Sequence, residues 1–391
     1  MSMIEKARAA APALAAADAP SAAQGRLTDE AVAALDATGV LRALQPARWG
    51  GGEAHLAEYA ETVIEIGRAS ASAGWVASVV GVHPWQIALF PEETQAEIWG
   101  EDPARRLASS YTPTGRVEKA PGGYRVSGRW SFSSGSGICD GVILGGIAGR
   151  REVNGTEYPD FTSVILDRAD YRIEDTWNVA GLRGTGSNDI VVDDVFVPEH
   201  RGQSHVLYTH GLGTPLPGQE LNDGPLYRTP WAVTFNLIIA AGAVGACLGF
   251  YDRWVAETRT RRTNYGQLLR EEHQVQNHLA EAAWQLDAAV LKVKRAADEL
   301  MEHAGRHEIP TLEQRAFWRW DVARAANAAT DAVQSLMRVS SGRSAFVDHP
   351  LQTRFQDAVA ASSHAFLFDD PLAKAWAGRH LGAEELAVVH L

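Results

Sequence analysis

The chain has 391 residues, of which 46% are hydrophobic and 21% are charged, a balance typical of a soluble globular protein with two or three structural units. Its net charge of −12 argues against a nucleic-acid partner, because phosphate binding needs a concentrated basic face. Cys139 and Cys247 are the only cysteines, which excludes a disulfide framework and a four-cysteine zinc site and leads us to expect a cytoplasmic location.

Two segments could be mistaken for targeting or membrane sequences. Met1–Ala23 is rich in alanine but carries charged residues, so it lacks the uninterrupted apolar core of a secretory signal. Trp231–Phe250 is long enough to cross a bilayer. Half of its residues are small, and Thr234 and Asn236 interrupt it, so we expect a helix buried in a bundle or subunit interface and no membrane partner.

Residues 1–105 are predicted to form an N-terminal α-helical domain. Apolar residues recur at helical spacing on both sides of Gly39, which marks a helix end. Ala57–Val79 predicts one long apolar helix with small residues on its packing face. Trp85–Trp99 predicts another helix, with a break and restart at Pro91.

Residues 106–225 are predicted to form a central antiparallel β-barrel. Six short segments are strand-like and are separated by Pro-Gly-Gly, Asn-Gly and glycine-rich turns. These segments are residues 107–111, 124–130, 141–147, 161–166, 171–175 and 188–198. Because no helical pattern lies between them, an antiparallel barrel or sandwich is favoured.

Residues 226–391 are predicted to form a C-terminal four-helix bundle. Helical spacing, with charged residues on the outer faces, covers four segments: Trp231–Thr260, Glu271–His303, Thr311–Ser341 and Pro371–Leu381. The predicted class is therefore α+β, with the order α, β, α along the chain.

The segment from Tyr124 to Ile147 carries the strongest candidate for a ligand site. It predicts two strands joined by a turn in which Gly135 and Gly137 let a ligand approach the backbone. Four hydroxyls accompany two large rings: Ser131, Ser133, Ser134 and Ser136 with Trp130 and Phe132. A flat heteroaromatic cofactor fits this set, since rings pack against its face and hydroxyls meet its polar edge. A serine-rich hairpin without a ligand is the alternative.

Other motifs give little support for nucleotide, metal or hydrolase chemistry. G-L-R-G-T-G, residues 181–186, is followed by a strand, whereas a dinucleotide site needs a helix N-terminus there. The sequence contains no P-loop, and Ser133-Ser134-Gly135 lacks the G-x-S-x-G elbow. His303 and His307 are four residues apart in a strongly polar stretch without an intervening glutamate, which indicates a solvated helix end, and we expect no metal.

Six motifs in chain order allow a family comparison: P-A-R-W-G-G, A-G-W-V-A-S-V-V-G-V-H-P-W-Q, W-S-F-S-S-G, G-L-R-G-T-G-S-N-D, V-F-V-P and H-P-L-Q-T-R-F-Q-D-A. With the α, β, α order they resemble the acyl-CoA dehydrogenase fold over nearly the whole chain. They resemble one branch in particular, the oxygenase components of two-component flavin-dependent aromatic hydroxylases such as 4-hydroxyphenylacetate hydroxylase. The dehydrogenases carry a glutamate base in the last domain, whereas His364 stands in that region here, which favours oxygen chemistry.

The resemblance implies a monooxygenase that receives reduced flavin, FADH2 or FMNH2, from a separate NAD(P)H-dependent flavin reductase. It would use O2 through a C4a-hydroperoxyflavin to hydroxylate an aromatic or heteroaromatic ring of the phenol or indole type. Such a hydroperoxide survives only where N5 keeps its proton and water is excluded. The resemblance also implies a homotetramer, for which the buried segment 231–250 would supply apolar interface surface.

The resemblance assigns several residues to the cofactor. Ser134 is similar to the serine that donates to flavin N5, with Ser133 at the neighbouring carbonyl and Trp130 and Phe132 near the ring. A capping hydroxyl in a turn is the alternative for Ser134.

Two arginines are expected to contact the cofactor as well. Arg262 in R-R-T-N-Y-G resembles an arginine that reaches the flavin pyrophosphate across a subunit boundary, although a solvated basic helix end is equally consistent with the sequence. Arg183 and the G-T-G-S turn are expected to face the flavin.

Four side chains are expected at the substrate and oxygen. His83 resembles the histidine that meets the phenol oxygen, although a capping or core histidine is the alternative. Ser109 resembles the second phenol-side contact, and Ser110, its alternative, is also a candidate cofactor contact. His364 resembles a histidine near the flavin and oxygen site, where some relatives have a tyrosine two residues later and this chain has Phe366.

Three other functions remain open at this point: an N-oxygenase of amino sugars or amines, an acyl-CoA dehydrogenase-type flavin oxidoreductase, and a non-catalytic flavin-binding protein. The sequence identifies neither the substrate nor the choice between FMN and FAD.

Overall fold

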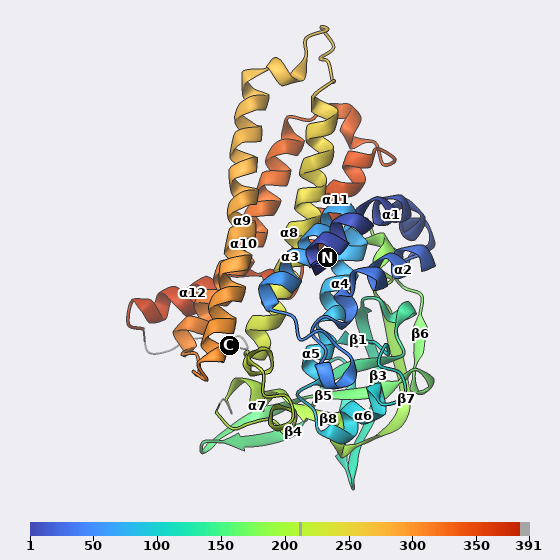
Figure 1. Cartoon of the computed structure of the whole chain (residues 1–391), viewed down its shortest axis with the longest axis vertical. Coiled ribbons are helices and arrows are strands. Elements are labelled where there is room, and N and C mark those ends of the chain that lie inside the picture. The colour runs from blue at the N-terminus through green and yellow to red at the C-terminus, as the bar shows by residue number, and fades with distance from the viewer. Residues whose placement is uncertain (211–212, 384–391) are drawn as a thin grey trace.

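The computed structural model describes residues 1–210 and 213–383. N-terminal helices, a β domain and a C-terminal helical bundle follow one another along the chain, and the bundle extends away from the strands (Figure 1). The predicted order α, β, α is therefore confirmed. Strand β1 begins at Leu107 and helix α8 at Trp231, near the two domain boundaries, which stay predictions.

Six helices form the N-terminal part: α1 Met3–Gln24, α2 Asp29–Thr38, α3 Leu56–Ala69, α4 Ala71–Gly81, α5 His83–Ile87 and α6 Glu92–Trp99. Gly39 ends α2 in the left-handed conformation, with φ at 82°, as its sequence position predicts. Pro91 separates α5 from α6, also as predicted.

The single helix predicted over Ala57–Val79 is two helices, so that prediction was wrong. The chain leaves helical geometry at Ser70, with φ −142° and ψ 116°, and the Ser70 hydroxyl accepts the Ala73 N–H at 3.2 Å. Gly74 lies so close to Gly67 that a Cβ added to it would meet Gly67 Cα at 2.3 Å. The apolar pattern continues across this corner because both helices are buried, so periodicity alone could not reveal the break.

Eight strands form two four-stranded sheets: β1 Leu107–Ser110, β2 Arg116–Ala120, β3 Gly123–Ser133, β4 Gly141–Val153, β5 Thr156–Asp167, β6 Arg172–Glu174, β7 Asn188–Pro198 and β8 Gly202–Ser204. The orders are β1-β4-β5-β8 and β2-β3-β7-β6, and the sheets contact each other through β2 with β4 and β1 with β3. All six predicted strands are present, and β2 and β8 are additional. Neighbouring strands are antiparallel except β1 and β4, which are parallel. Strand β1 follows helix α6 in the chain and is not joined to β4 by a hairpin.

The C-terminal bundle consists of α8 Trp231–Thr258, α9 His273–Gly305, α10 Leu312–Arg338 and α11 Pro350–Ser362. Helix α8 contacts α3, α4, α9, α10 and α11. Among the described residues it alone is long and apolar enough to cross a bilayer, yet 94% of its most apolar window is buried inside the protein. It is thus a core helix, as the small residues in its sequence predict. Helix α12, Asp369–His380, packs on α10, and the short α7, His205–Thr209, follows β8.

Candidate active site

A chain of hydroxyl groups starts in the turn after β3. The Ser134 hydroxyl lies 2.7 Å from that of Ser187, which lies 2.7 Å from the Thr185 hydroxyl. At one end the Trp75 indole N–H donates to Ser134 Oγ at 3.2 Å, and at the other the Thr185 hydroxyl donates to the Leu182 carbonyl at 2.9 Å. Residues from α4, the turn after β3 and the start of β7 therefore meet at one place, here called the hydroxyl relay.

The two ends of the hydroxyl relay fix the direction of its protons. An indole N–H can only donate and a carbonyl can only accept, so the Ser134 proton points to Ser187 and the Ser187 proton to Thr185. Ser134 then keeps a lone pair for a further donor. The relay therefore makes Ser134 an acceptor for an N–H, whereas the resemblance implies a donor.

His364 lies beside the relay, with its ring centroid 5.7 Å from that of Trp75. Its Nδ1 accepts the Phe366 N–H at 3.2 Å, so the neutral ring carries its proton on Nε2. Burial lowers the pKa of His364 to about 4, yet the side chain is partly accessible.

His83 and Ser109 form a second polar group. His83 Nδ1 lies 2.6 Å from the Leu107 carbonyl, which can only accept, so Nδ1 carries the ring proton. His83 Nε2 lies 2.9 Å from Ser109 Oγ and accepts the Ser109 proton. Burial lowers the pKa of His83 to about 4, so the ring is neutral at physiological pH. The start of α5 and strand β1 thus supply a fixed histidine–serine pair.

Aromatic side chains connect the two polar groups. From His83, ring centroids follow at 6.2 Å to Phe235, 4.5 Å to Trp231, 5.9 Å to Phe366 and 5.7 Å to His364. Tyr111 packs edge-on against Trp231 and Phe235 and donates to Gln86 Oε1 at 2.5 Å. A chain of packed rings therefore connects the His83–Ser109 pair to His364 and, through Trp75, to Ser134.

Three predicted cofactor residues are not brought to the hydroxyl relay. Trp130 is fully buried, and its indole N–H donates to the Gly145 carbonyl at 2.8 Å. The Ser110 hydroxyl donates to the Ser131 carbonyl at 2.6 Å. Both side chains stabilise the β domain from inside, because successive side chains of a strand alternate between its two faces and these two point to the interior. Phe132 is 69% exposed, and its ring meets the edge of Trp177 at the surface.

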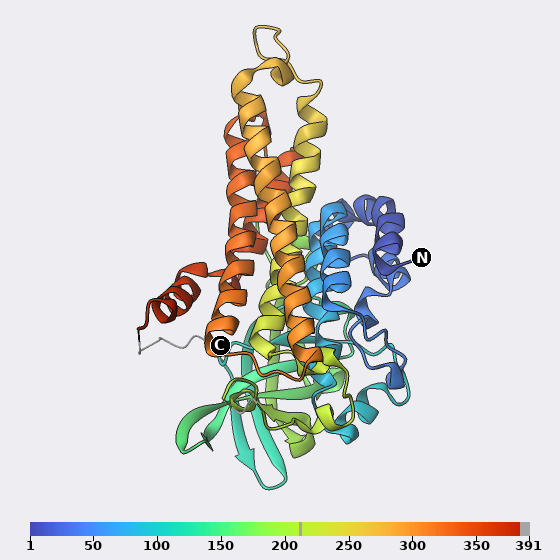
Figure 2. The same cartoon turned by 60° about the vertical axis from the view of Figure 1, so that its left-hand side comes forward.

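The two predicted arginines lie apart. Arg183 is exposed in the turn that contains Thr185, next to the hydroxyl relay. Arg262 lies in the segment between α8 and α9, where its guanidinium donates to the Gly266 carbonyl at 2.6 Å. That segment forms the tip of the bundle, at the opposite end of the molecule from the strands (Figures 1 and 2). Within a single copy of the chain, Arg262 is therefore remote from the hydroxyl relay.

These residues fit a reduced flavin at its ring end. Ser134 offers a lone pair to an N–H such as that at N5. Beside it, the Ser133 hydroxyl is fully buried and has no hydrogen-bond partner among the described residues. A buried hydroxyl without a partner is the kind of group that a ligand's carbonyl satisfies. The neutral His364 supplies a further donor at Nε2.

Sequence reasoning missed Trp75 and Tyr111, and it placed Ser187 at the flavin only as part of the G-T-G-S turn. Trp75 lies in A-G-W-V and Ser187 follows G-T-G, so both were inside motifs, but a motif does not tell which members meet Ser134. Tyr111 directly follows Ser109 and Ser110 at the end of β1, where successive side chains point to opposite faces of the sheet.

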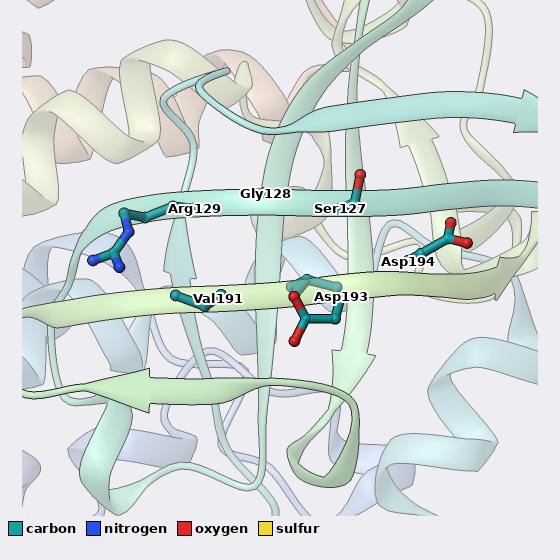
Figure 3. Close-up of a pocket in the computed structure, with 7 residues that line it drawn as sticks. Ser127, Gly128, Arg129, Val191, Asp193 and Asp194 are labelled. Carbon is teal, nitrogen blue, oxygen red and sulfur yellow. The ribbon is translucent and has the colours of Figure 1, made fainter.

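A hollow of about 520 Å³ lies elsewhere, along β3 and β7, and is lined by Ser127, Gly128 and Arg129 of β3 and by Val191, Val192, Asp193 and Asp194 of β7 (Figure 3). Arg129 and Asp194 are already paired, with Asp189 and Arg125 respectively. None of the predicted site residues lines this hollow, so it is separate from the candidate site.

The chain is similar to known proteins over most of its length. Residues 237–368 match the family described as acyl-CoA dehydrogenase, C-terminal domain. The flavin-dependent monooxygenase oxygenase subunit HsaA of Rhodococcus jostii is 39% identical, over 87% of this chain and 88% of its own. The FADH2-dependent resorcinol hydroxylase oxygenase component of a Rhizobium species is 34% identical, over 85% and 82%. The structure of 3-HSA hydroxylase from Rhodococcus sp. RHA1 has a TM-score of 0.91 at 32% identity, covering 100% of this chain and 99% of that one.

Proposed function

This chain belongs to the family of flavin-dependent monooxygenase oxygenase components, and from that premise we propose that it hydroxylates a phenol-type ring with reduced flavin and O2. Membership confirms the acyl-CoA dehydrogenase-like fold and the hydroxylase branch that the motifs resemble. One observation carries the proposal: a hydroxyl with a lone pair for an N–H and a neutral histidine–serine pair are connected by one chain of packed aromatic rings.

Reduced flavin, as FADH2 or FMNH2, supplies the electrons that activate O2 and delivers one oxygen atom to the substrate. Ser134 would hold an N–H of its ring, because the hydroxyl relay leaves a lone pair there. The Ser133 hydroxyl and His364 Nε2–H would donate to its polar edge. The packed aromatic side chains would keep water from the flavin ring, and this would prolong the life of reactive oxygen species bound there.

The histidine–serine pair would orient and polarise the phenol. Ser109 gives its own proton to His83, so its oxygen can accept the phenol O–H. His83, with its pKa lowered to about 4, is too weak a base to remove a proton from a phenol whose pKa is about 10. The pair therefore polarises the O–H bond without ionising it fully, and this raises the electron density of the ring.

A separate reductase supplies the flavin, in keeping with the relatives being oxygenase subunits or components. We propose that this reductase depends on NAD(P)H, that the oxygenase is a homotetramer, and that both act in the cytoplasm. The position of Arg262 at the far tip of the bundle supports assembly, because only another copy could bring that arginine to a flavin held at Ser134.

The test supplies chemically reduced FAD or FMN and O2 with resorcinol, p-hydroxyphenylacetate and indole, with an amine panel alongside. We expect a hydroxylated ring and no N-oxygenated product. In Ser134→Ala, loss of one buried hydrogen bond should lower the ratio of product to hydrogen peroxide by about tenfold. Ser127→Ala, on β3 and in the separate hollow, should match wild type.

Three results would redirect the assignment. N-oxygenated amines would point to the N-oxygenase alternative, and anaerobic dye reduction by acyl-CoA would point to a dehydrogenase. If every ring compound yields only peroxide, and Ser134→Ala behaves like wild type, the chain binds flavin without hydroxylating anything.

A further inference from the structure

A buried carboxylate on α11 holds the backbone next to the hydroxyl relay. Asp357 is 5% exposed, and its Oδ1 accepts the Leu182 N–H at 2.6 Å. Leu182 is in the left-handed conformation, with φ at 55°, which a leucine rarely adopts. Such a conformation persists only where the surroundings hold it, so the carboxylate bond restrains a strained residue.

Leu182 in turn anchors the far end of the relay. Its carbonyl accepts the Thr185 hydroxyl at 2.9 Å, the Thr185 N–H at 3.1 Å and the Trp177 indole N–H at 2.9 Å. The Thr185 carbonyl accepts the Gly135 N–H at 2.8 Å. The turn 182–187 is thus joined to the Ser134 turn both through the backbone and through the hydroxyls.

The same turn is packed against helices on two sides. A Cβ added to Gly181 would meet the Gln356 carbonyl of α11 at 2.1 Å. On α4, the Ser72 hydroxyl accepts the Gly184 N–H at 3.2 Å. The turn is therefore held by α11 at Gly181 and by α4 at Gly184, so we expect a change at Asp357 to be transmitted along it.

We propose that Asp357 is a positioning residue for the hydroxylation, whose ionised carboxylate fixes the 182–187 turn and thereby the direction of the Ser134 hydroxyl. The proposal rests on the proposed function. If Asp357 has this role, the yield of hydroxylated product per flavin oxidised depends on the protonation of its carboxyl group, which lies outside the hydroxyl relay.

The groups around Asp357 set its titration. Burial and the neighbouring charge of Asp18 on α1 raise the pKa of Asp357 to about 7, while the Leu182 N–H, Arg354 and Arg183 act in the opposite direction. Asp18 is itself held by the Ser70 hydroxyl at 2.6 Å. Arg354 is occupied by the Ala69 carbonyl at 2.9 Å, which keeps it from neutralising Asp357 directly.

The sign of the effect follows from these contacts. Above a pH of about 7 the carboxylate is ionised and is the stronger acceptor for the Leu182 N–H, so coupling to product should rise with pH. The stability of the fold changes in the opposite sense. Because the pKa of Asp357 is higher in the folded than in the unfolded chain, the free energy of unfolding decreases as pH rises toward 7. Retention of a carboxylate that destabilises the fold fits a positioning role.

The experiment compares wild type with Asp357→Asn, Asp357→Leu and Asp18→Asn, using chemically reduced flavin, O2 and the best phenol of the panel. The product-to-peroxide ratio is measured from about pH 6 to about pH 8.5. Hydrogen exchange of the 181–187 amides is measured in the same proteins without flavin. Asp252→Asn is the control, since that carboxylate pairs with Arg68 at the surface.

We expect the wild-type ratio to rise through a pH of about 7 and the Asp357→Asn ratio to lack this step, because asparagine accepts but does not titrate. Asp18→Asn should move the step to lower pH. Asp357→Leu should lower the ratio about tenfold at every pH and speed exchange of the Leu182 and Thr185 amides by a similar factor. The control should follow wild type.

Two results would overturn the proposal: a pH step in Asp357→Asn equal to that of wild type, or unchanged exchange and coupling in Asp357→Leu. If the leucine variant does not fold, the asparagine comparison still decides. A failure of the proposed function is distinct, since wild type would then form no hydroxylated product at any pH.

Discussion

Two histidines of this protein, the buried His83 and the partly exposed His364, are held neutral by their surroundings. His83 donates from Nδ1 and accepts at Nε2, whereas His364 accepts at Nδ1 and keeps its proton on Nε2. One tautomer therefore presents an acceptor to Ser109, and the other leaves an N–H donor on a ring that packs against Trp75. The same residue type serves opposite polar tasks because a different backbone group binds Nδ1 in each case.

The depressed pKa values of these histidines predict a loss of stability in mild acid. Folding lowers both pKa values to about 4, so the unfolded chain binds protons that the folded chain does not. The two histidines should therefore lower the free energy of unfolding as pH falls from about 6.5 to about 4, opposite in sign to the contribution of Asp357, and urea denaturation measures the change. His83→Gln should show a smaller decrease and a kcat/KM for the phenol about tenfold lower. An equal decrease in wild type and variant would contradict the assignment.

At the scale of elements, close glycine contacts join α3, α4 and α8. A Cβ on Gly67 would meet Gly245 Cα of α8 at 3.1 Å, and Gly74 is closer still to Gly67. These contacts let α4 lie near α8, and α4 carries Trp75 to the hydroxyl relay. The backbone approach therefore decides where an active-site donor sits.

Gly74→Ala is expected to destabilise the protein by about 1–3 kcal/mol, because the added methyl overlaps Gly67 Cα at 2.3 Å and the two helices must separate. Urea denaturation measures the change. Gly305→Ala at the end of α9 is the matched control, since a Cβ there meets nothing within 4 Å. A Gly74→Ala protein as stable as its control would show that the corner is not tightly packed.

At the scale of the whole molecule, the proposed role of Arg262 requires a second copy of the chain. The tip between α8 and α9 carries Arg262 far from the β domain that carries Ser134 (Figure 2). Arg262→Ala should weaken binding of reduced flavin about tenfold or more while leaving the hydroxyl relay intact, measured by anaerobic titration. Arg270→Ala in the same segment, where the guanidinium donates to the Arg259 carbonyl, is the control. Light scattering should give four copies, and a monomer that binds flavin with full affinity would contradict this arrangement.

Local patterns in the sequence determined the elements of this protein and much of its chemistry. Alternation and turn residues located six of the eight strands, Gly39 located a helix end, and the small residues of 231–250 indicated a buried helix. The resemblance of the motifs to a known family indicated Ser134, His83 and Ser109.

Only the tertiary structure decided which of these residues meet. Ser134 and Ser187 are 53 positions apart and Leu182 and Asp357 are 175 apart, so no local period relates them. The corner at Ser70, the parallel pairing of β1 with β4 and the inward turn of Trp130 likewise depend on packing between distant segments. Propensity and periodicity act over a few residues, whereas hydrogen-bond networks and close backbone contacts form only once the chain has brought remote segments together.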